Sequence, residues 1–518
     1  MLKLSSPLLS SSISSSKFKF LKFSIHHSSR MLTSVPLEST PSSLKEIASA
    51  NFTPAPQLKD DQLNPHALVA KYAVRGRIPT MAEDLKKKLK NDPSSVPFKK
   101  IISANIGNPQ QLDQKPITYY RQVLSLIEYP DMLDHPEISK IFPHDSIDRA
   151  KEILANLSSV GAYSHSKGVP YFRETVAHYI KDRDGHPSNP DDIYLTAGAS
   201  SAVNYLLSLL STGKETGFLI PIPQYPLYTA ALALNDASVL PYYLEESENW
   251  SVSAEQMEKV ITDAMDKNIK PRCIVLINPG NPTGAVLTED SIAKIINLAS
   301  KYGLVIIADE VYQENVYQGR FVSVKKVLRD LQAVDNVKYA NVQLASLHST
   351  SKGMIGECGQ RGGYMELIGF HDSVVQQILK LASISLCPPV IGQALVSLMV
   401  NPPHETHPSH DHFHYEKNNI YNALMERSHQ LFKAFNKMEG GRCIFEKAKA
   451  AAVDAGMEPD EFYCAKLLEN TGICTVPGSG FGQVPGTWHL RTTFLAPGTE
   501  WIDDWSKFHQ KFMDEYRD

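Results

Sequence analysis

The chain has 518 residues, of which 42% are hydrophobic and 21% are charged, a composition typical of a globular protein long enough for two or more domains. Its formal net charge of -4 gives no basic excess, so we expect no nucleic-acid partner. The six cysteines form no CxxC pair, which indicates free thiols rather than a disulfide framework or a zinc site. Beyond residue 50 no apolar run is long enough to span a bilayer, so we expect no membrane partner.

The N-terminal segment differs in composition from the rest of the chain. Residues 1–37 contain no Asp or Glu, are rich in serine and carry five basic residues. A basic, serine-rich leader without acidic residues is typical of an organelle transit peptide, and we predict such a leader over residues 1–45. The mitochondrion is the first choice of destination and the plastid the second, while Met31 offers an internal start for a cytosolic form. The alternative is a disordered tail that carries no targeting signal.

Helix and strand patterns alternate through the middle of the chain. A turn at Gly107-Asn108-Pro109 follows apolar residues and precedes a helical pattern over 119–127. Further helices are predicted over 202–210 and 289–302, and one begins near Pro170, where proline suits the first turn. One strand is expected to end at residue 196, and others are expected over 217–220, 273–277, 304–308 and 342–347.

This alternation predicts an α/β fold with a mostly parallel sheet whose two faces are covered by helices. In such sheets ligands bind beyond the carboxyl ends of the strands. Five predicted strands are followed by polar, aromatic or small residues, namely Gly198, Tyr225, Asn281, Asp309 and Lys352. Because five independent elements bring such residues to one edge, the sequence predicts a binding site there.

The most informative strand end is His348-Ser349-Thr350-Ser351-Lys352-Gly353, which is followed by Arg361. A lysine on a short turn after a strand can form an imine with a carbonyl compound. Neighbouring hydroxyl groups and an arginine suit a phosphate dianion. Pyridoxal phosphate carries both a carbonyl group and a phosphate, so we expect it as the cofactor. Taken alone, this stretch is more typical of a surface loop, and only its agreement with the other strand ends favours a site.

The other strand ends each have two interpretations. Residues 198–200 (Gly-Ala-Ser) open a helix whose free N–H groups could hold a phosphate, or the serine simply caps the helix. Tyr225, fixed between prolines, could stack on a flat heterocycle or pack in the interior. Asp309 and Tyr312 could serve a ring nitrogen and a ring oxygen, or Asp309 could cap a helix.

Beyond about residue 400 the pattern indicates a smaller domain. The Pro- and His-rich segment 402–414 matches no tetrahedral metal site, so we predict a solvated linker, and no metal, before a helix over 415–437. The glycine-rich stretch 476–482 lies outside any complete strand–GxGxxG–helix unit, which excludes a dinucleotide loop. Arg491 lies at the centre of a predicted strand over 488–494, where a substrate carboxylate would justify its burial.

Together these motifs resemble the class I aminotransferases of fold type I, which depend on pyridoxal phosphate. The resemblance covers roughly residues 70 to 515 and follows the family's order of motifs. Three stretches resemble the alanine-type members of that family: Tyr72-Ala73-Val74-Arg75-Gly76, residues 223–228 and residues 348–364. The implied fold is a large domain with a mostly parallel sheet between helices, together with a smaller α/β domain.

The resemblance also implies a role for each residue of the site. Lys352 would form the imine and move the proton between the substrate Cα and the cofactor. Asp309 would pair with the pyridine N–H, and Arg491 would bind the substrate carboxylate near the backbone of Gly107. Further cofactor contacts are implied for the phenolic oxygen (Asn281 and Tyr312), for the ring face (Tyr225), and for the phosphate (Gly198, Ala199, Ser200, Ser349, Arg361 and, from a second subunit, Tyr163). In many relatives the phosphate arginine stands eight residues after the lysine, whereas here Gln360 holds that place.

The activity implied by the resemblance is ping-pong transfer of an amino group from L-alanine to 2-oxoglutarate, which gives pyruvate and L-glutamate. Glutamate:glyoxylate transamination, or the activity of another class I member, is the alternative. A non-catalytic regulator with the same fold would usually carry a DNA-binding domain, which the low-complexity leader does not provide. The family also implies a homodimer.

The expected domain division is a leader (1–45), an N-terminal arm with part of the small domain (46–125), a large cofactor-binding domain (126–400) and a C-terminal small domain (401–518).

Overall fold

The computed structural model describes residues 42–53, 55–70, 76–438 and 445–517. Most of the predicted leader, and residues 72–75 of the first alanine-type motif, therefore lie outside the described residues. The chain divides into two compact units, residues 1–62 and 63–518. The described part of the first unit contains helix α1 (Ser42–Ala48) and a 3-10 turn at Asp60–Gln62.

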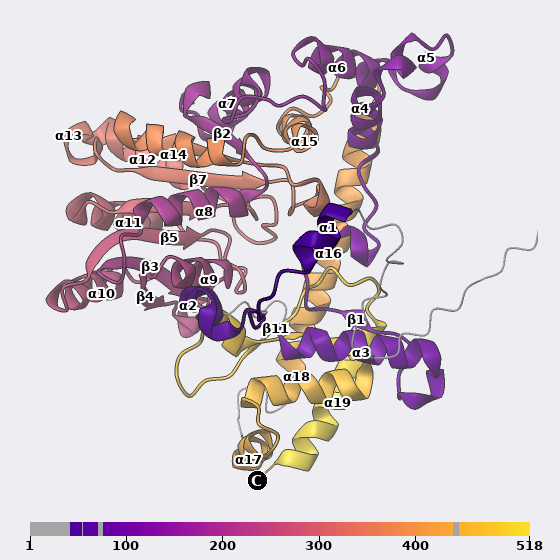
Figure 1. The fold of residues 1–518 in the computed structure, drawn as a ribbon, viewed down its shortest axis with the longest axis vertical. Coiled ribbons are helices and arrows are strands. Elements are labelled where there is room, and N and C mark those ends of the chain that lie inside the picture. The colour runs from indigo at the N-terminus through magenta and orange to yellow at the C-terminus, as the bar shows by residue number, and fades with distance from the viewer. Residues whose placement is uncertain (1–41, 54, 71–75, 439–444, 518) are drawn as a thin grey trace, which may run out of the picture. The chain divides into compact units, whose positions relative to one another are not determined.

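A seven-stranded sheet lies at the centre of the second unit, in the order β2-β8-β7-β6-β5-β3-β4 (Figure 1). Neighbouring strands are parallel, except that β8 runs antiparallel to both β2 and β7. The prediction of a mostly parallel sheet is therefore confirmed. The strands are β2 (Ile193–Thr196), β3 (Thr216–Ile222), β4 (Ser238–Tyr243), β5 (Lys270–Ile277), β6 (Val305–Asp309), β7 (Leu344–Ser349) and β8 (Gly363–Ile368).

Helices cover both faces of this sheet because its central strands are apolar on both sides. Within β6, for example, Ile306 packs into the core on one face and Ile307 into the core on the other. The first core is closed by α10 (Ala254–Asp266), α11 (Glu289–Tyr302), α12 (Val324–Val334) and α13 (Asn336–Tyr339). The second is closed by α8 (Ala199–Leu210), α9 (Leu227–Leu234) and α14 (Asp372–Ile384).

A third core joins helices from both halves of the chain at the edge of the sheet that carries β2. Its helices are α4 (Thr118–Glu128), α6 (His144–Ala155), α7 (Pro170–Asp184) and α15 (Val390–Val400), and α5 (Ile138–Ile141) lies between α4 and α6 in the chain. The long helix α16 (His410–Lys437) adds Phe413 to this core, and its Glu416 accepts hydrogen bonds from Thr118. None of the described helices is long and apolar enough to cross a membrane.

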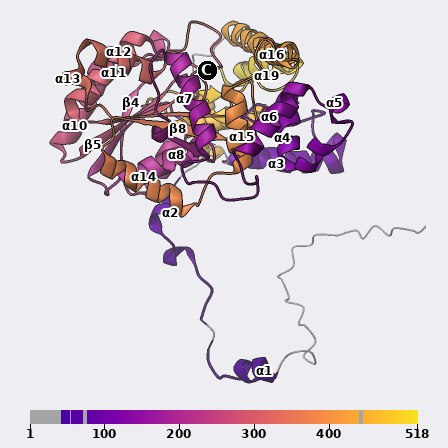
Figure 2. The same cartoon turned by 90° about the horizontal axis from the view of Figure 1, so that it is seen from above.

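A smaller set of elements combines the N-terminal and C-terminal parts of the second unit (Figure 2). Strand β1 (Ile102–Ser103) pairs in parallel with β9 (Ile473–Cys474), and β10 (Val476–Pro477) pairs antiparallel with β11 (Leu490–Arg491). The helices are α3 (Arg77–Asn91), α17 (Glu446–Asp454), α18 (Pro459–Thr471) and α19 (Glu500–Tyr516), whereas the short helix α2 (Pro65–Val69) contacts α9 beside the large sheet. The exact domain boundaries given above remain a prediction.

Two predicted elements of this region are wrong in extent. The strand predicted over 488–494 is reduced to the two residues of β11, because the N–H of Thr493 turns away to the carbonyl oxygen of Ala104 at 2.8 Å. Helix α16 begins at His410 rather than at residue 415, so the predicted linker is shorter. Ser409 fixes this start by donating both its N–H and its hydroxyl to Asp145.

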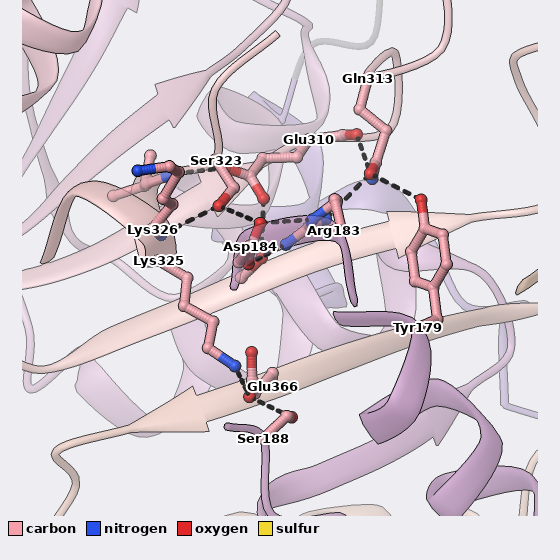
Figure 3. Close-up of polar contacts among 12 residues, drawn as sticks. Tyr179, Arg183, Asp184, Ser188, Glu310, Gln313, Ser323, Lys325, Lys326 and Glu366 are labelled. Carbon is pink, nitrogen blue, oxygen red and sulfur yellow. Dashed lines mark hydrogen bonds and ion pairs between the residues drawn. The ribbon is translucent and has the colours of Figure 1, made fainter. Parts of the chain in front are cut away.

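A buried ion pair supplies a test of the packing of this sheet. Lys325 of α12 is fully buried, and its Nζ lies 2.7 Å from Glu366 Oε1 on β8 (Figure 3). Replacing Lys325 by Met would leave the carboxylate of Glu366 buried without its cation, which typically lowers the free energy of unfolding by ~3–5 kcal/mol.

Lys259 provides the matched control, because it pairs with Asp263 on the exposed surface of α10 at 2.8 Å. Chemical denaturation of Lys325→Met and Lys259→Met would compare the two sites. We expect a large loss for the first and a change within ~0.5 kcal/mol for the second. Equal effects would contradict the assignment of Lys325 to the interior.

Candidate active site

Lys352 and Gly107 lie at the point where two distant segments of the chain meet. Lys352 follows strand β7 by three residues, and its Nζ donates a hydrogen bond to the carbonyl oxygen of Gly107 at 3.3 Å. The same Nζ lies 5.8 Å from the centre of the Tyr312 ring. Gly353 donates its N–H to Asn315 Oδ1 at 2.8 Å, which fixes the turn that carries the lysine. The structure therefore places the predicted turn at Gly107 beside the predicted lysine.

Asp309 is the last residue of strand β6 and is only 6% exposed. Its Oδ2 accepts a hydrogen bond from the Tyr228 hydroxyl at 2.8 Å, while Oδ1 has no hydrogen-bond partner among the described residues. Burial raises the pKa of Asp309 from its usual value of 3.8, and the Tyr228 hydroxyl, the nearby N–H of Val311 and the charge of Lys352 oppose this rise. Asp309 does not cap a helix, so that alternative is wrong.

A second group of predicted residues meets at the start of helix α8. Gly198 precedes this helix with φ of 76°, and no side chain caps the helix N-terminus, so capping by Ser200 is wrong. Arg361 donates from Nη2 to the carbonyl oxygen of Ala197 at 2.9 Å and to Ser200 Oγ at 3.2 Å. A Cβ at Gly198 would lie 2.4 Å from this Nη2, so only glycine admits the close approach. Arg361 therefore reaches the predicted phosphate position although it stands nine residues after Lys352.

A cleft lies at the carboxyl ends of the parallel strands, as the sheet topology predicts. Arg491 lines the same cleft as Lys352, and its guanidinium carbon lies 5.0 Å from the centre of the Phe481 ring. Arg491 also donates a hydrogen bond to the carbonyl oxygen of Asn105. Among the described lining residues these two are the cationic ones, so the cleft suits an anion. The predicted residues that line it are Gly107, Asn281, Tyr312, Lys352 and Arg491.

The positions of four further predicted residues are known, but these positions do not decide their roles. Ala199 is the first residue of α8, Ser349 ends β7, and half-buried Tyr225 follows β3. Tyr163 is 80% exposed, and it is not among the residues that line the cleft of its own chain. The roles predicted for these residues stay predictions.

Two residues of the site were not predicted from the sequence. Tyr228 holds Asp309, and Asn315 holds the lysine turn. Tyr228 stands one helical turn after Tyr225, at the start of α9, so the spacing of the two tyrosines was a signal that could have been used. Asn315 offers no comparable signal, because it lies in an irregular segment after β6.

The residues present fit pyridoxal phosphate. The free Oδ1 of Asp309 suits a ring N–H, because a buried carboxylate oxygen without a donor is unfavourable until one is supplied. The start of α8, with Arg361 beside it, suits a phosphate. Lys352 supplies an amine to the cleft, and its charge acts on Asp309, although neither Asp309 nor Arg361 is among the residues that line the cleft. In the part of the chain that the structure describes, no group of three or more His, Cys, Asp or Glu is placed to hold a metal ion.

Comparisons with known proteins agree with this geometry. The family described as “Aminotransferase class I and II” matches residues 137–501, which is more than half of the chain. The mitochondrial alanine aminotransferase of Saccharomyces cerevisiae is 57% identical over 494 residues, which cover 91% of this chain and 83% of the relative. A second protein of that yeast, named inactive alanine aminotransferase, is 53% identical over 488 residues, which cover 90% of this chain and 96% of the relative.

A solved structure supports the fold. The alanine aminotransferase from Pyrococcus furiosus matches with a TM-score of 0.67 and 24% sequence identity, covering 88% of this chain and 100% of that chain. At this identity the likeness concerns the arrangement of the elements.

The raised pKa of Asp309 generates a prediction for the cofactor-free protein. Because folding favours the protonated carboxyl, the contribution of this group to stability is fully present below pH 3.8 and is lost as the pH rises through the raised pKa. Asparagine cannot ionise and can still accept from Tyr228. Asp309→Asn should therefore raise the Tm of the cofactor-free protein near neutral pH, and the gain should shrink as the pH is lowered.

If Asp309 pairs with the ring nitrogen of bound pyridoxal phosphate, the same replacement should also lower turnover by ~10²-fold, because it removes that charge. Thermal unfolding of both proteins across a pH series, together with steady-state rates, provides the check. A lower Tm for the asparagine variant at neutral pH would contradict the assigned environment.

Proposed function

Because the chain belongs to the class I and II aminotransferases, we propose that it transfers the amino group of L-alanine to 2-oxoglutarate, with pyridoxal phosphate as cofactor. The products are pyruvate and L-glutamate, and the two substrates react in turn at one site. The observation that carries the proposal is one cleft lined by Lys352 and Arg491, with the open oxygen of Asp309 close enough to interact with the lysine charge.

Overall similarity does not decide whether the chain is active, because a relative that is 53% identical is named inactive. The reaction requires a particular amine, a carboxylate and a cation rather than a level of identity. This chain has each of them, as Lys352, Asp309 and Arg491. Their arrangement supports an active enzyme.

Pyridoxal phosphate, when bound, holds the amino group of the substrate covalently and takes up the electron pair that loss of the Cα proton releases. The amine of Lys352 would hold the cofactor at rest, and it would become free when the amino group of the substrate takes its place. The freed amine would then take the proton from the substrate Cα as a general base and deliver it to the cofactor carbon that carries the amino nitrogen, and the second half-reaction would run both transfers in reverse. Its hydrogen bond to Gly107 keeps Nζ at the wall of the cleft.

Asp309 and Arg491 orient the two ends of the reacting system. Asp309 accepts the ring N–H through Oδ1 while Tyr228 holds Oδ2, so the buried negative charge keeps the ring nitrogen protonated. The guanidinium of Arg491 binds the substrate carboxylate through two parallel N–H groups. Because alanine and the oxo acids all carry this carboxylate, one arginine serves both half-reactions.

The remaining predicted residues complete the proposed site. We assign Tyr225 to the ring face, Asn281 and Tyr312 to the phenolic oxygen, and the phosphate to Gly198, Ala199, Ser200, Ser349 and Arg361. A homodimer is part of the proposal, with the exposed Tyr163 reaching the phosphate site of the other subunit. The acid-free leader and the mitochondrial relative favour a mitochondrial location.

Lys352→Ala tests the proposed amine directly. We expect kcat to fall by ~10³-fold or more, because both the attachment of the cofactor and the proton transfer at Cα depend on this group. The phosphate and ring contacts should still bind cofactor, which an absorbance spectrum after gel filtration would detect. Lys259→Ala, on the surface of α10, is the matched control and should leave kcat unchanged. Wild-type turnover by Lys352→Ala would exclude the assignment.

Initial rates with L-glutamate as donor distinguish the proposed reaction from glutamate:glyoxylate transamination. Pyruvate differs from glyoxylate by one methyl group, and a pocket that fits this group typically discriminates by ~10- to 200-fold. We expect kcat/KM for pyruvate to exceed that for glyoxylate within this range. The reverse order would favour the glyoxylate reaction.

A further inference from the structure

Glu310 follows Asp309 directly and lies on the opposite side of the end of strand β6. Successive side chains of an extended chain point to opposite faces. Asp309 accepts a hydrogen bond from Tyr228 of α9 on one face of the sheet, whereas Glu310 accepts from Val324 of α12 on the other. Glu310 is fully buried and is not among the residues that line the cleft. Figure 3 shows it among polar side chains from several elements.

Both carboxylate oxygens of Glu310 accept hydrogen bonds from different elements. Oε1 accepts from the N–H of Val324, in the first turn of α12, at 2.8 Å. Oε2 accepts from the Ser346 hydroxyl, on β7, also at 2.8 Å. The N–H of Glu310 donates to the carbonyl oxygen of Leu347 at 3.0 Å. The side chain and the backbone of Glu310 therefore hold it against helix α12 and strand β7.

Gln313 braces the same turn from its other end. It stands next to Tyr312, and its Nε2 donates back to the carbonyl oxygen of Glu310 at 3.2 Å. Its Oε1 accepts from Arg183 of α7 at 2.9 Å (Figure 3). The turn that carries Asp309 and Tyr312 is thus held from behind by residues that do not line the cleft.

The elements that hold Glu310 are themselves connected. Ser323, the residue that caps α12, donates its hydroxyl to Asp184 at 2.8 Å, and Asp184 pairs with Arg183 at 2.7 Å. Helix α7, which carries both charged residues, therefore fixes the position of the first turn of α12. A buried network in which each group has a partner is rigid, because any movement would leave a polar group unsatisfied.

We propose that Glu310 is a positioning residue of the reaction, whose two hydrogen bonds fix the end of β6 and so aim the open oxygen of Asp309 at the ring nitrogen of the cofactor. The inference rests on the proposed cofactor. A misplacement of ~1 Å at a reacting group can change a rate by ~10²-fold, so a rigid support behind Asp309 has a direct chemical effect.

Three variants test whether the hydrogen bonds of Glu310, rather than its charge, support cofactor binding. Glu310→Ala removes both hydrogen bonds and should weaken the binding of pyridoxal phosphate by ~10-fold. Glu310→Gln can accept from the N–H of Val324 and donate to Ser346, so it should bind within ~3-fold of wild type. Ser346→Ala removes only one donor and should be intermediate, which keeps the test open if the alanine variant at 310 does not fold. A glutamine variant as weak as the alanine variant would overturn the positioning role.

A double-mutant cycle with Asp309→Asn distinguishes positioning from a general effect on folding. If Glu310 acts through Asp309, Glu310→Ala should change cofactor affinity by less than ~2-fold in the Asp309→Asn background. The Tm of the cofactor-free proteins measures the structural part, which should be the same in both backgrounds. An equal loss of affinity in both backgrounds would overturn the proposal. These experiments measure the affinity for pyridoxal phosphate and not the turnover of alanine. A chain that binds the cofactor but does not transaminate alanine would therefore refute the proposed reaction without refuting the role of Glu310.

Discussion

The structure depends on a buried carboxylate that is only half satisfied. Asp309 has one oxygen held by Tyr228 and the other open, at the end of a strand whose neighbours are apolar. An interior charge without a full set of donors is unfavourable for folding, and in a stable protein it is expected where a ligand completes the set. Lys352 follows the next strand of the sheet, and its charge acts on Asp309. These two groups support the proposed cofactor, a flat heterocycle that carries a ring nitrogen and a carbonyl group.

The sheet makes this arrangement possible because it aligns the ends of strands that are far apart in the sequence. The register pairs Ile277 with Asp309 and Asp309 with Leu347, so the segments after β5, β6 and β7 leave the sheet at one level. Each segment then contributes a different function to the cleft. The large apolar cores on both faces keep these strand ends in place. The network around Glu310 additionally fixes the end of β6, on which the direction of the Asp309 side chain depends.

Much of the large sheet and of the site could be predicted from the sequence, because buried parallel strands are short apolar runs and the groups that follow them share one edge. Contacts that depend on tertiary packing could not. The helix that begins at Leu227 brings Tyr228 back to Asp309; the spacing of Tyr228 from Tyr225 marks it as a candidate site residue but does not identify Asp309 as its partner. Arg361 reaches Ser200 through a left-handed backbone conformation, with φ of 57°, so its role could not be derived from spacing alone. The strand predicted around Arg491 was too long, because the hydrogen bond from the N–H of Thr493 to the carbonyl oxygen of Ala104 outweighs the β propensity of this segment.

The central claim is that the amine of Lys352 is the group that bonds to pyridoxal phosphate. Borohydride reduction of the cofactor-loaded protein, followed by proteolysis and mass spectrometry of the peptides, tests it most directly, because reduction makes the link permanent. We expect a pyridoxyl group on the peptide that contains Lys352, and none when excess L-alanine is added before reduction. A stable label on another lysine, or no label on a protein that has bound the cofactor, would contradict the account.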